Sequence, residues 1–161
     1  MFRLAVKKYC GLEGLGGLYG DGRWHTEGQP VLYTASSRSL AVLERFVHEE
    51  SIDLPDLMMV TVHIPDDLPF DQYTSAELPL NWDTTNAGNQ TDTQDIGTAF
   101  LQKGHYGYMR VPSAIIPHEY NYIINPLHHS AMRISLIEKH PYRYDSRYQR
   151  FIKSDISNSR V

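Results

Sequence analysis

The most regular hydrophobic pattern in the chain predicts an α-helix from residue 37 to about residue 50. Apolar residues recur there every three or four positions, which places them on one face of a helix. Ser36 or Ser37 stands just before this pattern and is a good N-cap, because a serine hydroxyl accepts a hydrogen bond from the first helical turn. The apolar positions are Leu40, Ala41, Leu43, Phe46 and Val47.

Most of the other apolar runs are short and rich in β-branched or aromatic residues, as is typical of β-strands. A second helix is predicted around residues 95–101, with Thr91 or Thr93 as its cap and Gly104 at its end. Residues 66–95 are polar and hold several prolines and asparagines, so they are predicted to be mostly loop with one helical turn. Strands are predicted at residues 1–6, 30–34, 56–65, 106–112 with 114–116, 119–124 and 133–138.

Together these elements predict a single α+β domain over residues 1–161, with a mixed, mostly antiparallel β-sheet core and a few flanking helices. Strands outnumber helices, and the helices fall between them irregularly rather than after every strand, which argues against a doubly wound fold. Residues 140–161 are charged and rich in tyrosine. They are expected to form either a last strand and helix or a tail that binds a partner.

Composition narrows the classes of function. The chain has 161 residues, of which 41% are hydrophobic and 21% charged, as is ordinary for a globular domain with a sizeable core. Its formal net charge of -4 argues against direct binding to nucleic acid, since such binding normally requires a basic surface. No apolar run approaches the roughly 20 residues of a membrane span, and the N-terminus lacks the apolar core of a signal peptide. Cys10 is the only cysteine, which excludes an intramolecular disulfide and fits the cytoplasmic location that we expect.

Three common arrangements of functional residues do not match the chain. Glycines are dense between residues 11 and 22, but no G-x-G-x-x-G turn joins a strand to a long helix there. His128 and His129 are adjacent, and adjacent side chains on a strand or turn point to different sides, so we expect no metal site. No G-x-S-x-G elbow surrounds any serine, which argues against a Ser-His-Asp hydrolase.

The candidate functional residues are concentrated between residues 20 and 50. Glu44 lies along the apolar stripe of the predicted helix, where an unpaired carboxylate is costly to bury. One interpretation is that Glu44 sits at the edge of the stripe and reaches water or pairs with Arg45 or His48. The other is that it faces a cleft and takes part in a reaction.

Two further side chains in this stretch suit a nucleotide. Arg23 offers a planar guanidinium that can hold a phosphate through two hydrogen bonds, unless it forms a surface ion pair with Asp21 or Glu27. Tyr33 closes a short β-prone run and offers an aromatic ring, although strand tyrosines usually belong to the core. A cation, an aromatic face and a carboxylate together suit a phosphate-bearing nucleotide.

Several short segments follow one another in a recognisable order. They are Arg3, Gly22-Arg23-Trp24-His25, Val31-Leu32-Tyr33-Thr34, Leu40-Ala41-Val42-Leu43-Glu44, Val111-Pro112-Ser113-Ala114 and Asn121-Tyr122-Ile123-Ile124-Asn125-Pro126. This ordered set resembles the RES domain family, which is named for an arginine, a glutamate and a serine. The likeness extends from Met1 to about Ser135.

The resemblance implies a fold related to ADP-ribosyltransferases and an attack on NAD⁺ that severs the bond between nicotinamide and ribose. NAD⁺ is then the substrate, and no separate cofactor is expected. The resemblance also implies that the chain is the toxin half of a bacterial toxin-antitoxin pair, with a cognate Xre-type antitoxin as its protein partner. Contact with DNA would run only through that antitoxin, and a homodimer stays open.

Carried over position by position, the resemblance assigns the family's arginine to Arg23, its glutamate to Glu44 and its serine to Ser113, with Tyr33 and Arg3 as further pocket residues. In these roles Glu44 stabilises the positive charge that develops on the ribose, and Arg23 holds the phosphates. Ser113 offers its hydroxyl to the ribose or the amide, and Tyr33 offers its ring.

Two alternatives to hydrolysis or phosphorolysis of NAD⁺ stay open. A transferase would pass ADP-ribose to a protein acceptor, which requires the same carboxylate but a different nucleophile. A non-enzymatic module would keep the fold and bind a partner through the tail rich in tyrosine and arginine. The chain also departs from the family pattern at His25, where asparagine often follows the tryptophan.

Overall fold

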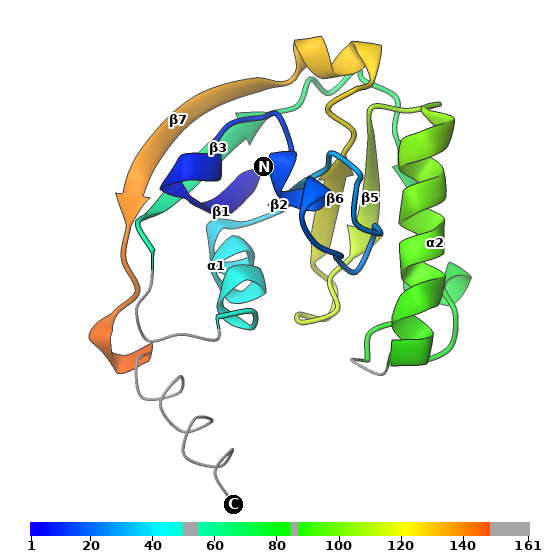
Figure 1. Ribbon diagram of the computed structural model, residues 1–161, viewed down its shortest axis with the longest axis horizontal. Coiled ribbons are helices and arrows are strands. Elements are labelled where there is room, and N and C mark those ends of the chain that lie inside the picture. Colours follow the sequence, from blue (N-terminus) through cyan, green and yellow to red (C-terminus); the bar gives the residue numbers. More distant parts are fainter. Residues whose placement is uncertain (50–54, 85–86, 149–161) are drawn as a thin grey trace, which may run out of the picture.

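A single β-sheet forms the centre of the structure, a computed structural model that describes residues 1–49, 55–84 and 87–148 (Figure 1). Its strands are β1 (Phe2–Val6), β2 (Leu32–Ala35), β3 (Leu57–His63), β4 (Asp71–Gln72), β5 (Tyr108–Pro112), β6 (Tyr120–Ile124) and β7 (Ser135–Tyr142). They lie side by side in the order β4-β5-β6-β2-β1-β3-β7. Neighbouring strands are antiparallel except β4 and β5, which are parallel. The predicted mixed, mostly antiparallel α+β fold is therefore confirmed.

Two α-helices, α1 (Arg38–Phe46) and α2 (Ala87–Lys103), pack on the same face of this sheet. Ala35 packs in the cluster beneath α1, and Tyr33 packs against the cluster beneath α2. Because the two residues are two positions apart on β2, their side chains point to the same face. Short 3₁₀ helices complete the fold, namely η1 (Lys7–Tyr9), η2 (Leu15–Leu18), η3 (Ser75–Glu77), η4 (His129–Arg133) and η5 (Ser146–Tyr148).

The first helix begins where its sequence predicts. Ser37 is the N-cap of α1, and its Oγ accepts a hydrogen bond from the backbone N–H of Leu40 at 3.1 Å. Leu40 is fully buried, so the predicted apolar face is the one that meets the sheet. The helix ends at Phe46, a turn earlier than the pattern predicts, and the next residue, Val47, is 55% exposed and lies outside the core.

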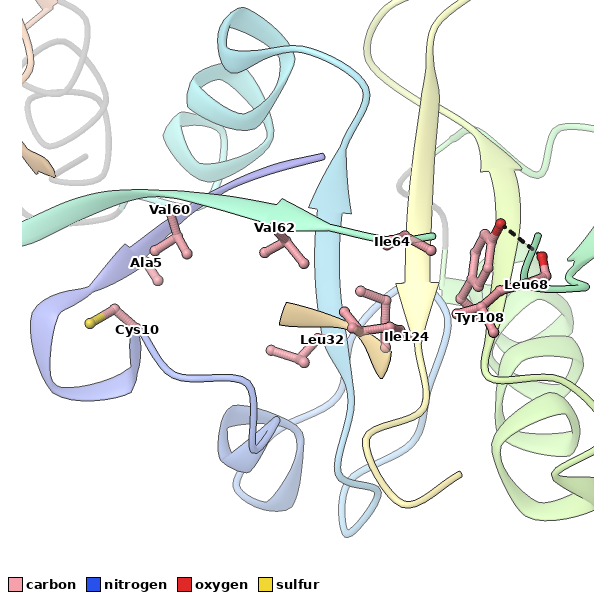
Figure 2. Close-up of a cluster of buried hydrophobic side chains, with 10 residues drawn as sticks. Ala5, Cys10, Leu32, Val60, Val62, Ile64, Leu68, Tyr108 and Ile124 are labelled. Atoms are coloured by element: carbon pink, nitrogen blue, oxygen red, sulfur yellow. Dashed lines mark hydrogen bonds between the residues drawn. The ribbon is translucent and has the colours of Figure 1, made fainter. Parts of the chain in front are cut away.

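The opposite face of the sheet carries a second core, shown in Figure 2. Leu32, Val60 and Ile124 are each 1% exposed there, and they come from three different strands. The Tyr108 hydroxyl donates a 3.4 Å hydrogen bond to the carbonyl of Leu68, which satisfies its only donor inside this core (Figure 2).

The second helix is longer than predicted. α2 begins at Ala87, within the stretch predicted to be loop, and neither proposed threonine is its cap. Thr93 lies inside the helix, fully buried, and its Oγ1 donates back to the carbonyl of Gln90 at 3.0 Å. The residues around it include glycine, asparagine and threonine, which are weak helix formers, so tertiary packing rather than local propensity stabilises this first half of α2.

Other boundaries also differ from prediction. The two-residue strand β4 falls in the predicted loop, and residues 114–116 form a bend rather than a strand. β7 extends to Tyr142, so the start of the predicted tail belongs to the sheet. η5 follows, and residues 149–161 lie outside the described residues.

Candidate active site

Glu44, on α1, is held by two side chains that come from the end of β5 and from β6. Ser113, directly after β5, donates its hydroxyl to Glu44 Oε1 at 2.9 Å. Asn121, on β6, donates its amide Nδ2 to the same oxygen. Arg45 does not pair with Glu44, because its Nε forms an ion pair with Glu49 at 2.8 Å. The carboxylate is therefore directed across the α1-facing side of the sheet rather than along its own helix.

Arg23 is fixed by backbone carbonyls rather than by an acid. Its Nη1 donates to the carbonyl of Trp82 at 2.6 Å and to that of Thr84 at 3.3 Å. The expected alternative, a surface ion pair with Asp21 or Glu27, is not among the ion pairs of the described residues, and Asp21 instead accepts the backbone N–H of Glu27 at 2.6 Å. One edge of the guanidinium thus anchors the loop before α2, and its charge is not neutralised by a carboxylate among the described ion pairs.

The loop that carries Arg23 is docked on α2. Gln94 donates its side-chain amide to the carbonyl of Gly22 at 3.0 Å, and Thr98 Oγ1 accepts the backbone N–H of Thr26 at 3.0 Å. Trp24, between these two contacts, is 2% exposed and packs in the core beneath the helix. The tryptophan therefore serves packing.

The hydroxyl of Tyr33 forms its hydrogen bonds with the same loop. The backbone N–H of Trp24 donates to it at 3.1 Å, and His25 Nδ1 lies 2.8 Å away. His25 Nε2 lies 3.0 Å from the carbonyl of Gly20, which can only accept, so Nε2 carries the proton and Nδ1 accepts from Tyr33. Burial lowers the pKa of His25, which keeps the ring in this neutral form. With its hydroxyl fixed, Tyr33 has only its ring to offer a ligand.

The charges of Arg23 and Glu44 both act on the pKa of the Tyr33 phenol. Its pKa is raised well above the usual range, mainly by burial. The hydrogen bond from Trp24 and the Arg23 charge lower it, whereas the Glu44 charge raises it further. The same phenol therefore lies within electrostatic reach of both Arg23 and Glu44.

Arg3 lies elsewhere, which corrects the expectation that it shares this pocket. Phe2 pairs with Ala35 on the face covered by α1, so the next side chain, Arg3, points to the opposite face. There its Nη1 donates to the carbonyls of Tyr9 and Gly11, each at 3.0 Å. Burial lowers the pKa of Arg3. The guanidinium fixes the loop after β1 on the side of the sheet away from Glu44.

The sequence matches the RES domain family over residues 2–145. The chain belongs to the RES domain family. Curated relatives of this RES domain include the Prs ADP-ribosylating toxin of Sphingobium sp. (strain YBL2), 35% identical over 84% of this chain and 85% of the relative. Another is Toxin Res of Pseudomonas putida, 37% identical over 88% of this chain and 95% of the relative.

A solved structure supports the fold of this RES domain. The toxin-antitoxin complex MbcT-MbcA of M. tuberculosis contains a chain that superposes with a TM-score of 0.71, covering 95% of this chain and 86% of that one. Sequence identity is 15%, so this likeness concerns the fold alone.

Sequence reasoning on the RES domain missed Asn121 as a site residue, although a signal was present. Asn121 is two positions before Ile123 on β6, so the two side chains share a face. Ile123 is fully buried, and a polar side chain in register with it must find a partner. That partner is Glu44, which could not be named without knowing that β6 runs beside α1.

The described part of this RES domain contains neither a metal-binding cluster nor a membrane-spanning helix. Across residues 1–49, 55–84 and 87–148, no three His, Cys, Asp or Glu side chains gather closely enough to hold a metal ion. The helices in this part of the chain are also too short or too polar for a membrane span.

Proposed function

We propose that this RES domain is the toxin of a toxin-antitoxin pair and that it uses NAD⁺, cleaving the bond between nicotinamide and ribose. Relatives at 35% and 37% identity carry the names Prs ADP-ribosylating toxin and Toxin Res, and both are aligned over most of this chain. An ADP-ribosylating toxin draws its ADP-ribose from NAD⁺, so the relative's name supports the substrate.

The proposal rests on the way in which the two carboxylate oxygens of Glu44 are hydrogen-bonded. Both of its described hydrogen bonds, from Ser113 and Asn121, go to Oε1. Within the described residues no hydrogen bond reaches Oε2, so this oxygen can face a substrate. Tyr33, whose pKa responds to the charges of both Glu44 and Arg23, would supply the ring, and Arg23 the cation, that a dinucleotide needs.

A carboxylate placed in this way suits the chemistry of nicotinamide loss. Nicotinamide leaves as a neutral base, and the ribose passes through an oxocarbenium-like state with positive charge on its ring, as in glycoside hydrolysis. At about 4 Å and an effective dielectric constant near 20, a carboxylate stabilises such a charge by roughly 4 kcal/mol. Since the charge exists mainly in the transition state, this corresponds to about a thousandfold in rate.

Arg23 has the geometry to bind the phosphates of the same substrate. Its Nη1 is held by the carbonyls of Trp82 and Thr84, which sets the plane of the guanidinium. Its other N–H groups make no hydrogen bond within the described residues and are free to form a fork on a phosphate. Tyr33 would then stack its ring against the nicotinamide or the ribose.

The acceptor of the ADP-ribose distinguishes two forms of the proposal. Water or inorganic phosphate would give hydrolysis or phosphorolysis, which depletes NAD⁺. A side chain of another protein would give ADP-ribosylation, which the name of the Sphingobium relative favours. Both forms need Glu44 for departure of nicotinamide.

Incubating the purified protein with NAD⁺, with and without phosphate, tests the proposal. Nicotinamide release with free ADP-ribose or its phosphate supports NAD⁺ depletion, and transfer of label to an added protein extract supports ADP-ribosylation. Glu44→Gln should lower nicotinamide release about a thousandfold, the size of its charge stabilisation, and keep the fold. Glu138→Gln, at a carboxylate on β7 bonded to Arg38 and His140, is the matched control and should stay active.

A protein that releases no nicotinamide under any of these conditions would leave only the partner-binding alternative. Growth arrest on expression, relieved by a cognate Xre-type antitoxin, tests the cellular part of the proposal. A Glu44→Gln variant that still arrests growth would separate toxicity from NAD⁺ cleavage.

A further inference from the structure

The hydroxyl of Ser113 has no hydrogen-bonding capacity left for a substrate. Its Oγ accepts the backbone N–H groups of Ile115 and Ile116 at 3.0 and 3.1 Å. Its single hydrogen is donated to Glu44 Oε1 at 2.9 Å. A serine hydroxyl has one donor and two acceptor positions, and all three are occupied inside the protein.

Asn121 completes the arrangement from the neighbouring strand. A carboxylate can only accept, so the amide presents its NH₂ group to Glu44 and not its oxygen. Both donors converge on Oε1, and neither contacts Oε2. Two neutral donors on one oxygen fix the rotation of the carboxylate without cancelling its charge.

We propose that Asn121 and Ser113 are positioning residues, which hold Glu44 by Oε1 so that Oε2 faces the sugar of the substrate. This inference rests on the proposed function for the identity of that sugar. It assigns a role to Asn121 and makes Ser113 act through Glu44 rather than by contact with the ribose or the amide.

Glu119 ties this pair of donors to the start of α1. Its carbonyl accepts the backbone N–H of Ser113 at 2.9 Å. Its Oε2 accepts the hydroxyl of Ser37, the N-cap of α1, at 3.1 Å. The helix that carries Glu44 and the turn that carries Ser113 thus share one anchor, which sets the distance between carboxylate and donors.

Steady-state kinetics of nicotinamide release separate positioning from substrate contact. Asn121→Leu removes the donor and keeps the side-chain size, and Ser113→Ala removes the hydroxyl. Each should lower kcat about tenfold to a hundredfold, as expected for a lost hydrogen bond to a charged group, with KM for NAD⁺ unchanged. Ser130→Ala, which loses a hydroxyl bonded to His128 at 2.8 Å in η4, is the control and should leave both constants as they are. A raised KM with unchanged kcat would instead identify a direct substrate contact and overturn the proposal.

A charge variant gives a signature that a loss of packing would not produce. In Asn121→Asp, the new carboxyl can donate to Glu44 only while it is protonated, because two carboxylates in contact share one proton. We expect kcat of this variant to be near the wild-type value at acidic pH and to fall as the pH rises and the shared proton is lost. A pH profile parallel to that of the wild type would contradict the role of Asn121.

Unfolding by urea tests the contact without any substrate, and so separates it from the proposed function. Glu44→Ala, Asn121→Leu and the double variant form a double-mutant cycle. The double variant should change the equilibrium constant of unfolding by a factor that differs at least several-fold from the product of the two single-variant factors, as for side chains in contact. Additive effects would overturn the contact itself. Non-additive effects without nicotinamide release would keep the contact and reject the proposed reaction.

Discussion

In the proposed function, Arg23 would use one guanidinium for two tasks. Its Nη1 fixes the carbonyls of Trp82 and Thr84, and its remaining N–H groups are left for a ligand. A lysine carries the same charge but is a point donor on a flexible stem, so it cannot hold both the loop and a phosphate fork. The proposed role would therefore require arginine at this position for its shape as well as for its charge.

Arg23→Lys should weaken NAD⁺ binding about tenfold to a hundredfold, the range for a lost charge-assisted hydrogen bond. Calorimetry in the Glu44→Gln background measures the affinity without consumption of NAD⁺. Arg133→Lys, whose guanidinium pairs with Asp67 at 2.7 Å on the surface, is the matched control. Equal affinity in the Arg23 variant and the parent would contradict a phosphate role.

His25 makes the stability of the site depend on pH. Burial lowers its pKa in the folded state, whereas the unfolded chain has the ordinary value of about 6.5. Below that pH the unfolded state binds a proton that the folded state resists, so the free energy of unfolding decreases as the pH falls. Protonation also removes the Nδ1 acceptor for the Tyr33 hydroxyl.

His25→Asn should therefore lose less thermal stability than the wild type between pH 7.5 and pH 5.5, measured as Tm by circular dichroism. His128, whose pKa is lowered mainly by burial as well, contributes with the same sign and remains in the variant. Identical pH dependence in the two proteins would show that His25 is not held neutral by the fold.

At the scale of elements, α2 packs against the loop of residues 22–26, which carries Arg23, and holds it in place. Gly97 faces the backbone of Trp24, where an added Cβ would lie 1.9 Å from the carbonyl oxygen and 2.6 Å from the carbonyl carbon. Such a contact is with backbone and cannot be relieved by a side-chain rotation. The absence of a side chain at Gly97 thus lets the loop lie close against the helix.

Gly97→Ala should destabilise the protein, although alanine in a helix is intrinsically favoured over glycine by about 1 kcal/mol. The loop must shift, so NAD⁺ binding to the variant in the Glu44→Gln background should weaken as well. Urea unfolding and calorimetry measure the two effects. Gly16→Ala is the control, since no atom lies within 4 Å of the added Cβ. Increased stability of Gly97→Ala would show that the contact is easily relieved.

At the scale of the whole molecule, the central strands carry the site on a rigid sheet. Ile123 lies on β6 between β5 and β2 and is fully buried beneath α2. It is two residues from Asn121, so the same strand supplies core packing and a partner for Glu44. Stability and site geometry are therefore coupled through β6.

Ile123→Ala should lower the free energy of unfolding by about 2–5 kcal/mol, because it leaves a cavity in a packed core. That is a large share of the roughly 5–15 kcal/mol that stabilises a typical domain. Ile137→Ala removes the same atoms from an edge strand at a residue that is 59% exposed, and its effect should stay within about 0.5 kcal/mol. Similar losses for both variants in urea unfolding would contradict the assigned core.

The sequence by itself determined what depends on neighbours along the chain. The spacing of apolar residues and the Ser37 cap predicted α1, and short β-prone runs predicted β1, β2 and β6, because these patterns follow from local geometry. Residues Arg23, Tyr33 and Glu44 could be singled out for the same reason, since their chemistry stands out against their local pattern.

Only the tertiary structure decided which of these side chains meet. Glu44 finds its partners 69 and 77 positions later in the chain, at Ser113 and Asn121, and the register of β1 turns Arg3 to the other face. The first half of α2 and the two residues of β4 likewise form where packing favours them, against a weak local signal. Strand order and register arise from contacts between distant segments, and hydrophobic periodicity along one segment does not specify them.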